Sequence, residues 1–325
     1  MLIYYCIAYS YKKLHRDNKL FLNISGSLNK FCGEGSANFV KNVFYVDDCL
    51  KSVSPPEAVI SLIKKTKSLC EKGGFNLHEF ISNHKAVIDT IPHKDRSKDL
   101  QDLDITKGIL PVERALGVQW CVESDTLQFR VEVKDKPLAG RGILSTVSFV
   151  FDPLGMLAPL ILVGKIILQE LSRDGANWDD KVPEPLRSRW ERRRADLALL
   201  SSLKIPRCYK PERFGELKSV ELHHFSDASK DTYGQCSYPW LIDHSDQIHC
   251  PLVMAKSRFA PLKPVTIPRL ELTAALVSVK TSSILQRELE YDQITEVYWT
   301  DSKVVIGYIN NDARRSHVFV ANRVQ

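Results

Sequence analysis

Short apolar runs dominate the first part of the chain. They lead into "KNVFYVDDCLKSV" at 41–53, where four strand-forming residues precede two adjacent aspartates, Asp47 and Asp48. This pattern predicts a hairpin that contains both acids. Apolar positions then recur at helical spacing over 56–72, after Pro56 and before a Gly-Gly pair, which predicts a helix. The stretch "FNLHEFISN" that follows favours a strand.

The middle of the chain is predicted to combine a hairpin with helices. Two apolar runs flank the turn-forming residues 123–125, which predicts a hairpin over 114–133. The segment 139–172 is predicted to be helical with one break at 152–155, where a proline removes a backbone donor. A basic helix is expected over 184–203, followed by the linker "IPRCYKPERFGELKS".

The pattern in the last part of the chain changes to strands. Three candidate strands come first, at 220–227, 233–241 and 248–257. A helix is predicted at 268–289, followed by the strand "EVYWTD" and the short helix "SKVVIGYI". This order of elements predicts one α/β domain over 213–325.

Composition indicates an ordinary globular protein. Hydrophobic residues make up 44% of the chain and charged residues 26%, and the formal net charge is +6. The mild basicity is compatible with a polyanionic partner. The eight cysteines have no metal-ligand spacing, so we expect reduced thiols in an intracellular protein, cytoplasmic or nuclear. No apolar run reaches the ~20 residues of a membrane helix, so no membrane partner is expected.

Three acids of the last domain lie at the ends of predicted elements. Asp227 ends the first strand, Glu271 lies in the first turns of the helix, and Asp301 ends the following strand. If folding gathers them, their negative charges need a cation, and Mg²⁺ prefers carboxylate oxygens. Each acid alone has an ordinary alternative use, as a turn former, a cap or a partner of the helix dipole. His223 and His224 beside them are expected to be structural.

The motifs "FSDAS", "RLELTAAL" and "VYWTDSKVVIGYI" follow one another in the last domain. In this order they resemble the ribonuclease H domain of retroelement polyproteins, most closely the Pao/BEL class of LTR retrotransposons. The resemblance implies that Asp227, Glu271 and Asp301 are catalytic acids that hold Mg²⁺ or Mn²⁺ in a two-metal site. The implied reaction is hydrolysis of the RNA strand of an RNA–DNA hybrid.

Two motifs upstream extend the resemblance. "FYVDDCL" resembles the YxDD hairpin of the reverse transcriptase palm, which implies Asp47 as a metal ligand, Asp48 in a supporting catalytic role, and Tyr45 near the primer strand. "LGVQW" resembles the primer-grip hairpin, so Gly117 and Trp120 are expected to contact nucleic acid. On the residues alone, a solvated acidic turn is the alternative to the YxDD interpretation.

The helical segment that begins "GILSTVSFVFDPLGMLAP" resembles the region between polymerase and ribonuclease H in Pao-type elements, often catalogued as a Pao retrotransposon peptidase. An aspartic peptidase needs an Asp-Ser/Thr-Gly loop, and neither "TDSK" nor "RDGA" provides one, so no peptidase activity is expected. Basic residues of the middle region are expected to contact phosphates, with a solvated face as the alternative. They include Lys134, Arg141, Arg189 and Arg193.

The resemblance implies a multidomain α/β and α+β protein. It places the end of a reverse transcriptase palm in 1–110, a primer-grip hairpin with a helical thumb or connection in 111–212, and a ribonuclease H-like domain in 213–325. The family's earlier palm aspartate and fourth ribonuclease H acid have no counterpart in the sequence. Both enzymatic domains are therefore expected to be incomplete, with no polymerase activity and weak or no nuclease activity without the rest of the polyprotein.

Two other classes of function fit the same sequence. A nuclease-dead module would bind RNA–DNA hybrid or single strands with strong salt dependence and without cleavage. An inert structural or interaction fragment would use the acids only as caps and turn formers. Mg²⁺ would not stabilise such a fragment.

Overall fold

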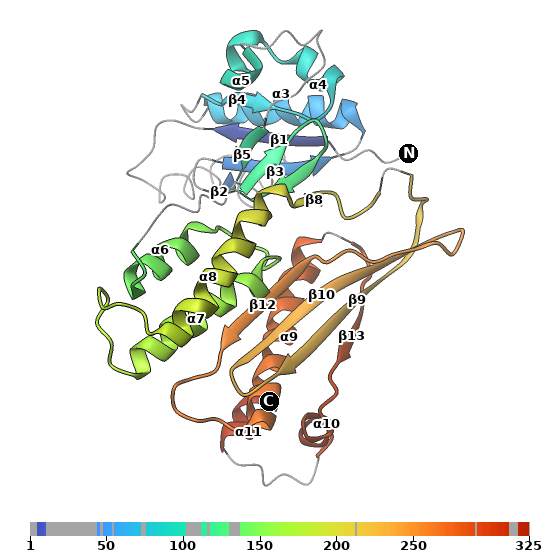
Figure 1. Ribbon diagram of the computed structural model, residues 1–325. Helices are drawn as coiled ribbons and strands as arrows, with labels where there is room; N and C mark the ends of the chain where they lie inside the picture. The colour runs from blue at the N-terminus through green and yellow to red at the C-terminus, as the bar shows by residue number, and fades with distance from the viewer. Residues whose placement is uncertain are drawn as a thin grey trace. The chain divides into compact units, whose positions relative to one another are not determined.

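The structure is a computed structural model that describes residues 5–10, 44–45, 48–53, 55–72, 76–101, 112–115, 118–129, 137–211, 213–289, 291–311 and 318–324. The chain divides into two units (Figure 1). The first contains Met1–Gln128 and Lys204–Cys208, and the second contains Phe129–Leu203 and Tyr209–Gln325. The division into three domains at 110 and 212 stays a prediction.

A four-stranded sheet of order β2-β3-β1-β4 forms one part of the first unit. Its strands are β1 (Tyr5–Ser10), β2 (Phe44–Tyr45), β3 (Asp48–Val53) and β4 (His78–Ile81). Strands β2 and β3 pair antiparallel with Tyr45 opposite Asp48, so the predicted hairpin is confirmed. The predicted helix is α3 (Pro56–Lys72), which buries Val59 and Leu69 completely. Shorter helices follow at α4 (Lys85–Thr90), η1 (His93–Asp95) and α5 (Lys98–Gln101).

A second sheet of the first unit has the order β5-β6-β7-β8. Its strands are β5 (Val112–Ala115), β6 (Val118–Cys121), β7 (Thr126–Gln128) and β8 (Lys204–Pro206). The predicted hairpin is β6–β7. The predicted linker is wrong at both ends. Ile205 pairs with Leu127 in the edge strand β8, and residues 217–219 begin the next strand.

Trp120 belongs to the interior of this unit. Its side chain is 0% exposed, and its indole Nε1 donates to Asp125 Oδ1 at 2.9 Å. Arg207 donates to both oxygens of the same carboxylate, at 2.7 and 2.8 Å. A tryptophan whose ring is buried and whose N–H is satisfied stabilises the core. The expectation that Trp120 contacts nucleic acid is therefore wrong, because no face of its ring reaches solvent.

Three helices begin the second unit: α6 (Gly140–Phe149), α7 (Ala158–Arg173) and α8 (Glu184–Leu199), the last extended by η3 (Leu200–Ser202). The predicted break between the first two is confirmed. Asp152 sits in the break and accepts the N–H groups of Met156 and Leu157, at 2.9 and 2.8 Å. Burial raises the pKa of Asp152. None of the helices in the described ranges is long and apolar enough to span a membrane.

The large sheet of the second unit has the order β11-β10-β9-β13, and β12 also pairs with β10. Its strands are β9 (Leu217–Ala228), β10 (Thr232–Asp243), β11 (Ile248–His249), β12 (Met254–Phe259) and β13 (Thr295–Trp299). Neighbours of β10 are antiparallel to it, whereas β13 is parallel to β9. The strand predicted at 248–257 is therefore two strands, β11 and β12.

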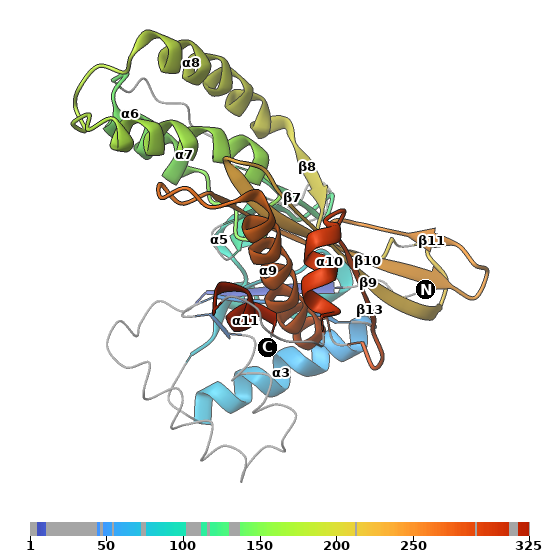
Figure 2. The same ribbon diagram turned by 90° about the horizontal axis from the view of Figure 1, so that it is seen from below.

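Helix α9 (Ile267–Glu288) covers one face of this sheet and is seen behind it in Figure 1. Leu285 of α9 packs in one buried cluster with Leu222 of β9 and Val253. Leu272 packs in another cluster with residues of α10 (Lys303–Ile309) and α11 (Val318–Val324), the helices beside it in Figure 2. These contacts at both ends of α9 fix its first turns beside the strand ends.

Candidate metal centre

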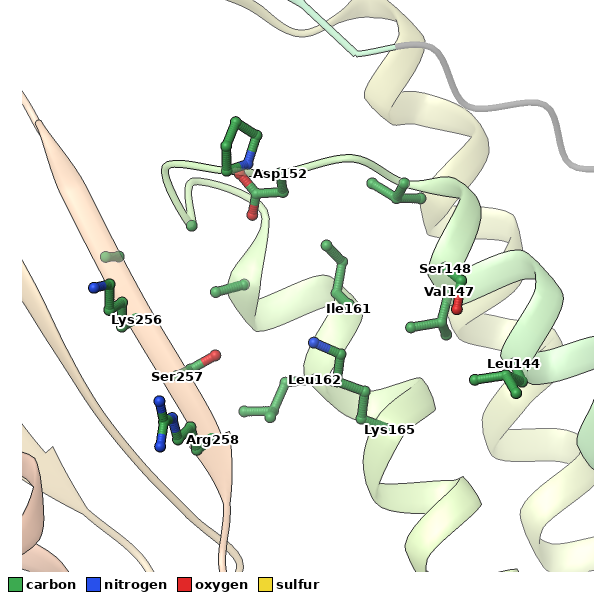
Figure 3. A pocket seen from close by; sticks show the side chains of 15 residues that line it. Leu144, Val147, Ser148, Asp152, Ile161, Leu162, Lys165, Lys256, Ser257 and Arg258 are labelled. Carbon is green, nitrogen blue, oxygen red and sulfur yellow. The ribbon is translucent and has the colours of Figure 1, made fainter. Parts of the chain in front are cut away.

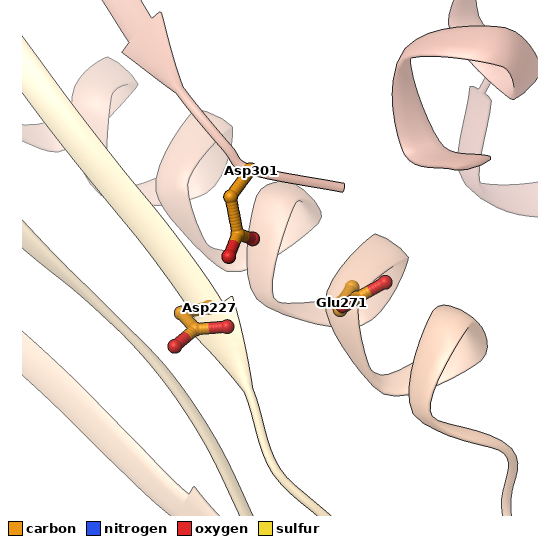
Figure 4. Close-up of side chains that lie close together, drawn as sticks. All are labelled: Asp227, Glu271 and Asp301. Atoms are coloured by element: carbon orange, nitrogen blue, oxygen red, sulfur yellow. The ribbon is translucent and has the colours of Figure 1, made fainter. Parts of the chain in front are cut away.

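The direction of the strands brings three acids together. Since β13 is parallel to β9, the carboxyl ends of the two strands lie next to each other at one end of the sheet. Asp227 is the last residue but one of β9, Asp301 follows β13, and Glu271 lies in the first turns of α9. One ligand atom from each carboxylate lies within 4.8 Å of the others (Figure 4). The predicted gathering of the three acids is confirmed.

The three carboxylates have the chemistry of a site for a divalent cation. Three negative charges at this separation repel one another unless a cation lies between them. Carboxylate oxygens are the ligands that Mg²⁺ and Mn²⁺ prefer. Asp227 and Asp301 are exposed and Glu271 is half-buried, so a bound ion would keep positions open to water or substrate. The residues present fit such an ion.

Ser302 orients the half-buried carboxylate. Its hydroxyl donates to Glu271 Oε2 at 2.5 Å and accepts the N–H of Val305 at 3.3 Å, which makes it the N-cap of α10. The Ser302 side chain thus links α10 to Glu271 on α9. This hydroxyl was not predicted as a site residue, although its position next to Asp301 in "TDS" is a usable signal.

Replacing Ser302 with Ala is expected to weaken metal binding by about 10-fold or more, because a ligating carboxylate loses its orienting partner. Lost capping should also cost about 1 kcal/mol. Ser302→Thr keeps the hydroxyl and should restore most of the affinity. Manganese titration measures the affinity, and a melt without metal measures the cap. Equal affinities for Ser302→Ala and wild type would rule out the orienting role.

The two histidines of β9 have structural partners, as expected. His223 Nδ1 accepts the indole N–H of Trp299 at 3.0 Å, so its Nε2 carries the proton shared with Glu221 at 2.9 Å. His224 is 0% exposed, and its Nδ1 lies 2.8 Å from Ser237 Oγ. Burial, together with the neighbouring His223, lowers the pKa of His224 to about 4. Neither ring is directed to proton transfer at the acids.

The arginines predicted to contact nucleic acid are paired with acids. Arg141 donates to both oxygens of Asp179, at 2.8 and 3.0 Å. Arg189 donates to Glu170 at 2.7 Å, and Arg193 to Asp196 at 3.1 Å. Their charges are locally compensated, which weakens the case for phosphate contacts.

Several other predicted site residues cannot be placed. Asp47, Gly117 and Lys134 lie outside the described residues. Tyr45 and Asp48 are described only as paired strand positions.

A sheet of this order, a helix across it, and a site made by two acids at the carboxyl ends of neighbouring parallel strands and a third acid on that helix define a ribonuclease H-like domain. A family model described as the Pao retrotransposon-like RNaseH-like domain matches residues 139–302. The chain belongs to this family. The match begins next to the start of α6 and ends at Ser302, so it includes the three helices before the sheet.

Two solved structures have a weak likeness to the chain. A foamy viral protease-reverse transcriptase in complex with double-stranded DNA matches at 12% identity and a TM-score of 0.48, over 100% of this chain and 55% of that one. Another structure of a foamy viral protease-reverse transcriptase with DNA matches at 13% identity and a TM-score of 0.18, over 91% and 59%. The chain thus spans little more than half the length of either. No curated protein matches the chain.

Proposed function

We propose that the second unit hydrolyses the RNA strand of an RNA–DNA hybrid. The observation that carries the proposal is the meeting of Asp227, Glu271 and Asp301, whose ligand atoms lie within 4.8 Å of one another. The cations would be Mg²⁺ or Mn²⁺, as the resemblance to the ribonuclease H domain of retroelements implies. A family match alone would not single out these acids.

The chain's own residues would act by holding and orienting. Asp227 and Asp301 are exposed and would be open to the substrate, while Ser302 orients the half-buried Glu271. Bound divalent ions would activate a water molecule and stabilise the leaving oxygen of the phosphodiester. No described histidine beside the acids is available as a general base, because His223 and His224 are held in other hydrogen bonds.

Strand-specific cleavage tests the proposal. Purified chain is incubated with RNA–DNA hybrid, RNA duplex and DNA duplex, each with one labelled strand, in Mg²⁺ or Mn²⁺. Slow formation of products from the RNA strand of the hybrid alone is the expected result, in keeping with the weak activity expected from the sequence. Hybrid binding without products in either metal would favour the nuclease-dead binding module. Absence of both binding and products would favour the inert fragment.

We also propose that the first unit derives from the end of a reverse transcriptase palm. The β2–β3 hairpin, with Tyr45 opposite Asp48, supports this assignment because a YxDD motif occupies such a hairpin. Asp47 and Asp48 would then be acids of a polymerase site, completed by other parts of the polyprotein. A structure of the polyprotein with this hairpin remote from the primer end would contradict the assignment.

A further inference from the structure

Three basic residues lie at the same end of the large sheet as the metal centre. Strand β12 runs in the same direction as β9, since β10 is antiparallel to both. Lys256 and Arg258 lie on β12, and Lys230 lies in the turn that follows β9. The backbone N–H of Ala260 donates to the carbonyl of Asp231 at 2.7 Å, which joins that turn to the end of β12. We name Lys230, Lys256 and Arg258 the rim cations.

The strand register gives the separation between the rim cations and the acids. Lys256 is opposite Gln235, which is opposite Ser226, the neighbour of Asp227. Arg258 is likewise two strands away from the residue after Asp227. Two strand spacings are roughly 10 Å. At 3.4 Å of axial rise per nucleotide, that separation spans about three nucleotides of a bound strand.

The two cations of β12 lie on the face of the sheet that α9 covers. Directly opposite strand residues share a face, so Lys256 shares the face of Gln235 and of Ser237, two residues on. Ser237 forms a hydrogen bond with His224 of β9. Leu222 lies two residues before His224, on the same face, and packs in one cluster with Leu285 of α9. Figure 3 shows Lys256 and Arg258 on one side of β12 and Ser257 on the other, and all three residues line the cavity of about 420 Å³ beside α7. Glu271 lies on α9, the helix over this face. By the same rule Asp227 aligns with Gly234 and Ser257, so it alternates to the other face where β9 ends.

The rim cations have no compensating partner. Among the described residues, none of the three side chains makes a hydrogen bond or an ion pair, whereas the side chains of Arg141, Arg189 and Arg193 are all paired with acids. Lys230 and Arg258 are exposed and Lys256 is half-exposed. The uncompensated positive charge of the rim cations favours a negatively charged ligand. A ligand that extends from the rim cations to the metal centre would contact both.

We propose that Lys230, Lys256 and Arg258 bind the sugar-phosphate backbone of nucleic acid on the β12 side of the metal centre. The inference rests on the proposed function for its ligand, an RNA–DNA hybrid. Contacts of this kind position a strand and carry no sequence information. The uncompensated cations of the sheet would thus bind the backbone, and the paired arginines of the helical region would not.

The test compares two triple variants that remove equal charge. One changes the rim cations (Lys230→Gln, Lys256→Gln, Arg258→Gln), and the matched control changes the paired arginines (Arg141→Gln, Arg189→Gln, Arg193→Gln). Binding of a hybrid with 2′-O-methylated RNA, which resists hydrolysis, is followed by anisotropy over a range of salt concentrations. The slope of log K against log salt should fall in magnitude by about 2–3 for the rim variant, since each phosphate contact contributes about 0.9. The control should keep the wild-type slope.

Each outcome decides the proposal separately from the proposed function. Backbone binding by the rim cations would be contradicted if the salt slope of the rim variant is unchanged, or if the control loses as much slope. Either result would stand even if wild type cleaves hybrid. A selective loss would support the proposal even if no cleavage is seen. Melting curves verify folding, and the single change Arg258→Gln should reduce the slope by about 1 if the triple variant is unstable.

Discussion

Replacing Asp301 with Asn is expected to abolish hydrolysis of hybrid while raising the stability of the metal-free protein. The substitution removes one of three carboxylates whose ligand atoms lie within 4.8 Å. Hydrolysis should fall by at least about 10²-fold, the usual effect of losing one preorganised electrostatic contact in a transition state. Stability without metal should rise, because fewer like charges repel one another.

Melting curves without metal measure the stability of the metal-free protein, and curves with metal measure how much the bound ion adds. At a metal concentration of 100 times Kd, a bound ion stabilises wild type by about 2.7 kcal/mol, and the variant should lose this increment. Asp292→Asn is the matched control, because Asp292 is an exposed acid in the loop before β13, at the other end of that strand. It should leave hydrolysis and the metal increment unchanged. Equal activity in Asp301→Asn and Asp292→Asn would contradict the metal-centre assignment.

Replacing Gly155 with Ala is expected to destabilise the second unit by about 3–5 kcal/mol. Gly155 lies in the break between α6 and α7 with a φ of +75°. A Cβ atom there would lie 1.8 Å from the carbonyl oxygen of Ala255 on β12. The neighbouring Leu154 carbonyl accepts the N–H of Ala255 at 2.8 Å, so the substitution should also break that bond. Denaturant unfolding measures the change.

Gly175 provides the control for backbone strain. Its φ is +73°, but no described atom lies within 4 Å of a Cβ built on it. Gly175→Ala should therefore cost only the left-handed backbone penalty of about 1–2 kcal/mol. Similar losses in the two variants would show that the contact between the break and β12 contributes nothing to stability.

Elements with a long apolar period were predictable from the sequence. Helices α3 and α9 were predicted within a residue or so of their ends, since many apolar positions define each period. Strands β5 and β8 were missed, because four and three residues carry little pattern and their pairing partners make them strands. Period alone is thus a weak guide to short edge strands.

The acids of the candidate site were predictable, but their surroundings were not. Asp227, Glu271 and Asp301 stand in motifs whose order carries the resemblance. The bond from Ser302 to Glu271 depends on the packing of α10 beside α9, which no local pattern shows. Trp120 was assigned to nucleic acid from its motif, but tertiary contacts with Asp125 and Arg207 bury it.

Manganese binding followed by electron paramagnetic resonance tests most directly whether the three acids form one metal centre. Wild type is titrated beside Asp227→Asn, Asp301→Asn and the control Asp292→Asn. We predict saturable binding in wild type and in the control, and its loss in both triad variants. Equal binding in all four proteins would show that the ions lie elsewhere and would contradict the metal centre on which the proposed hydrolysis depends.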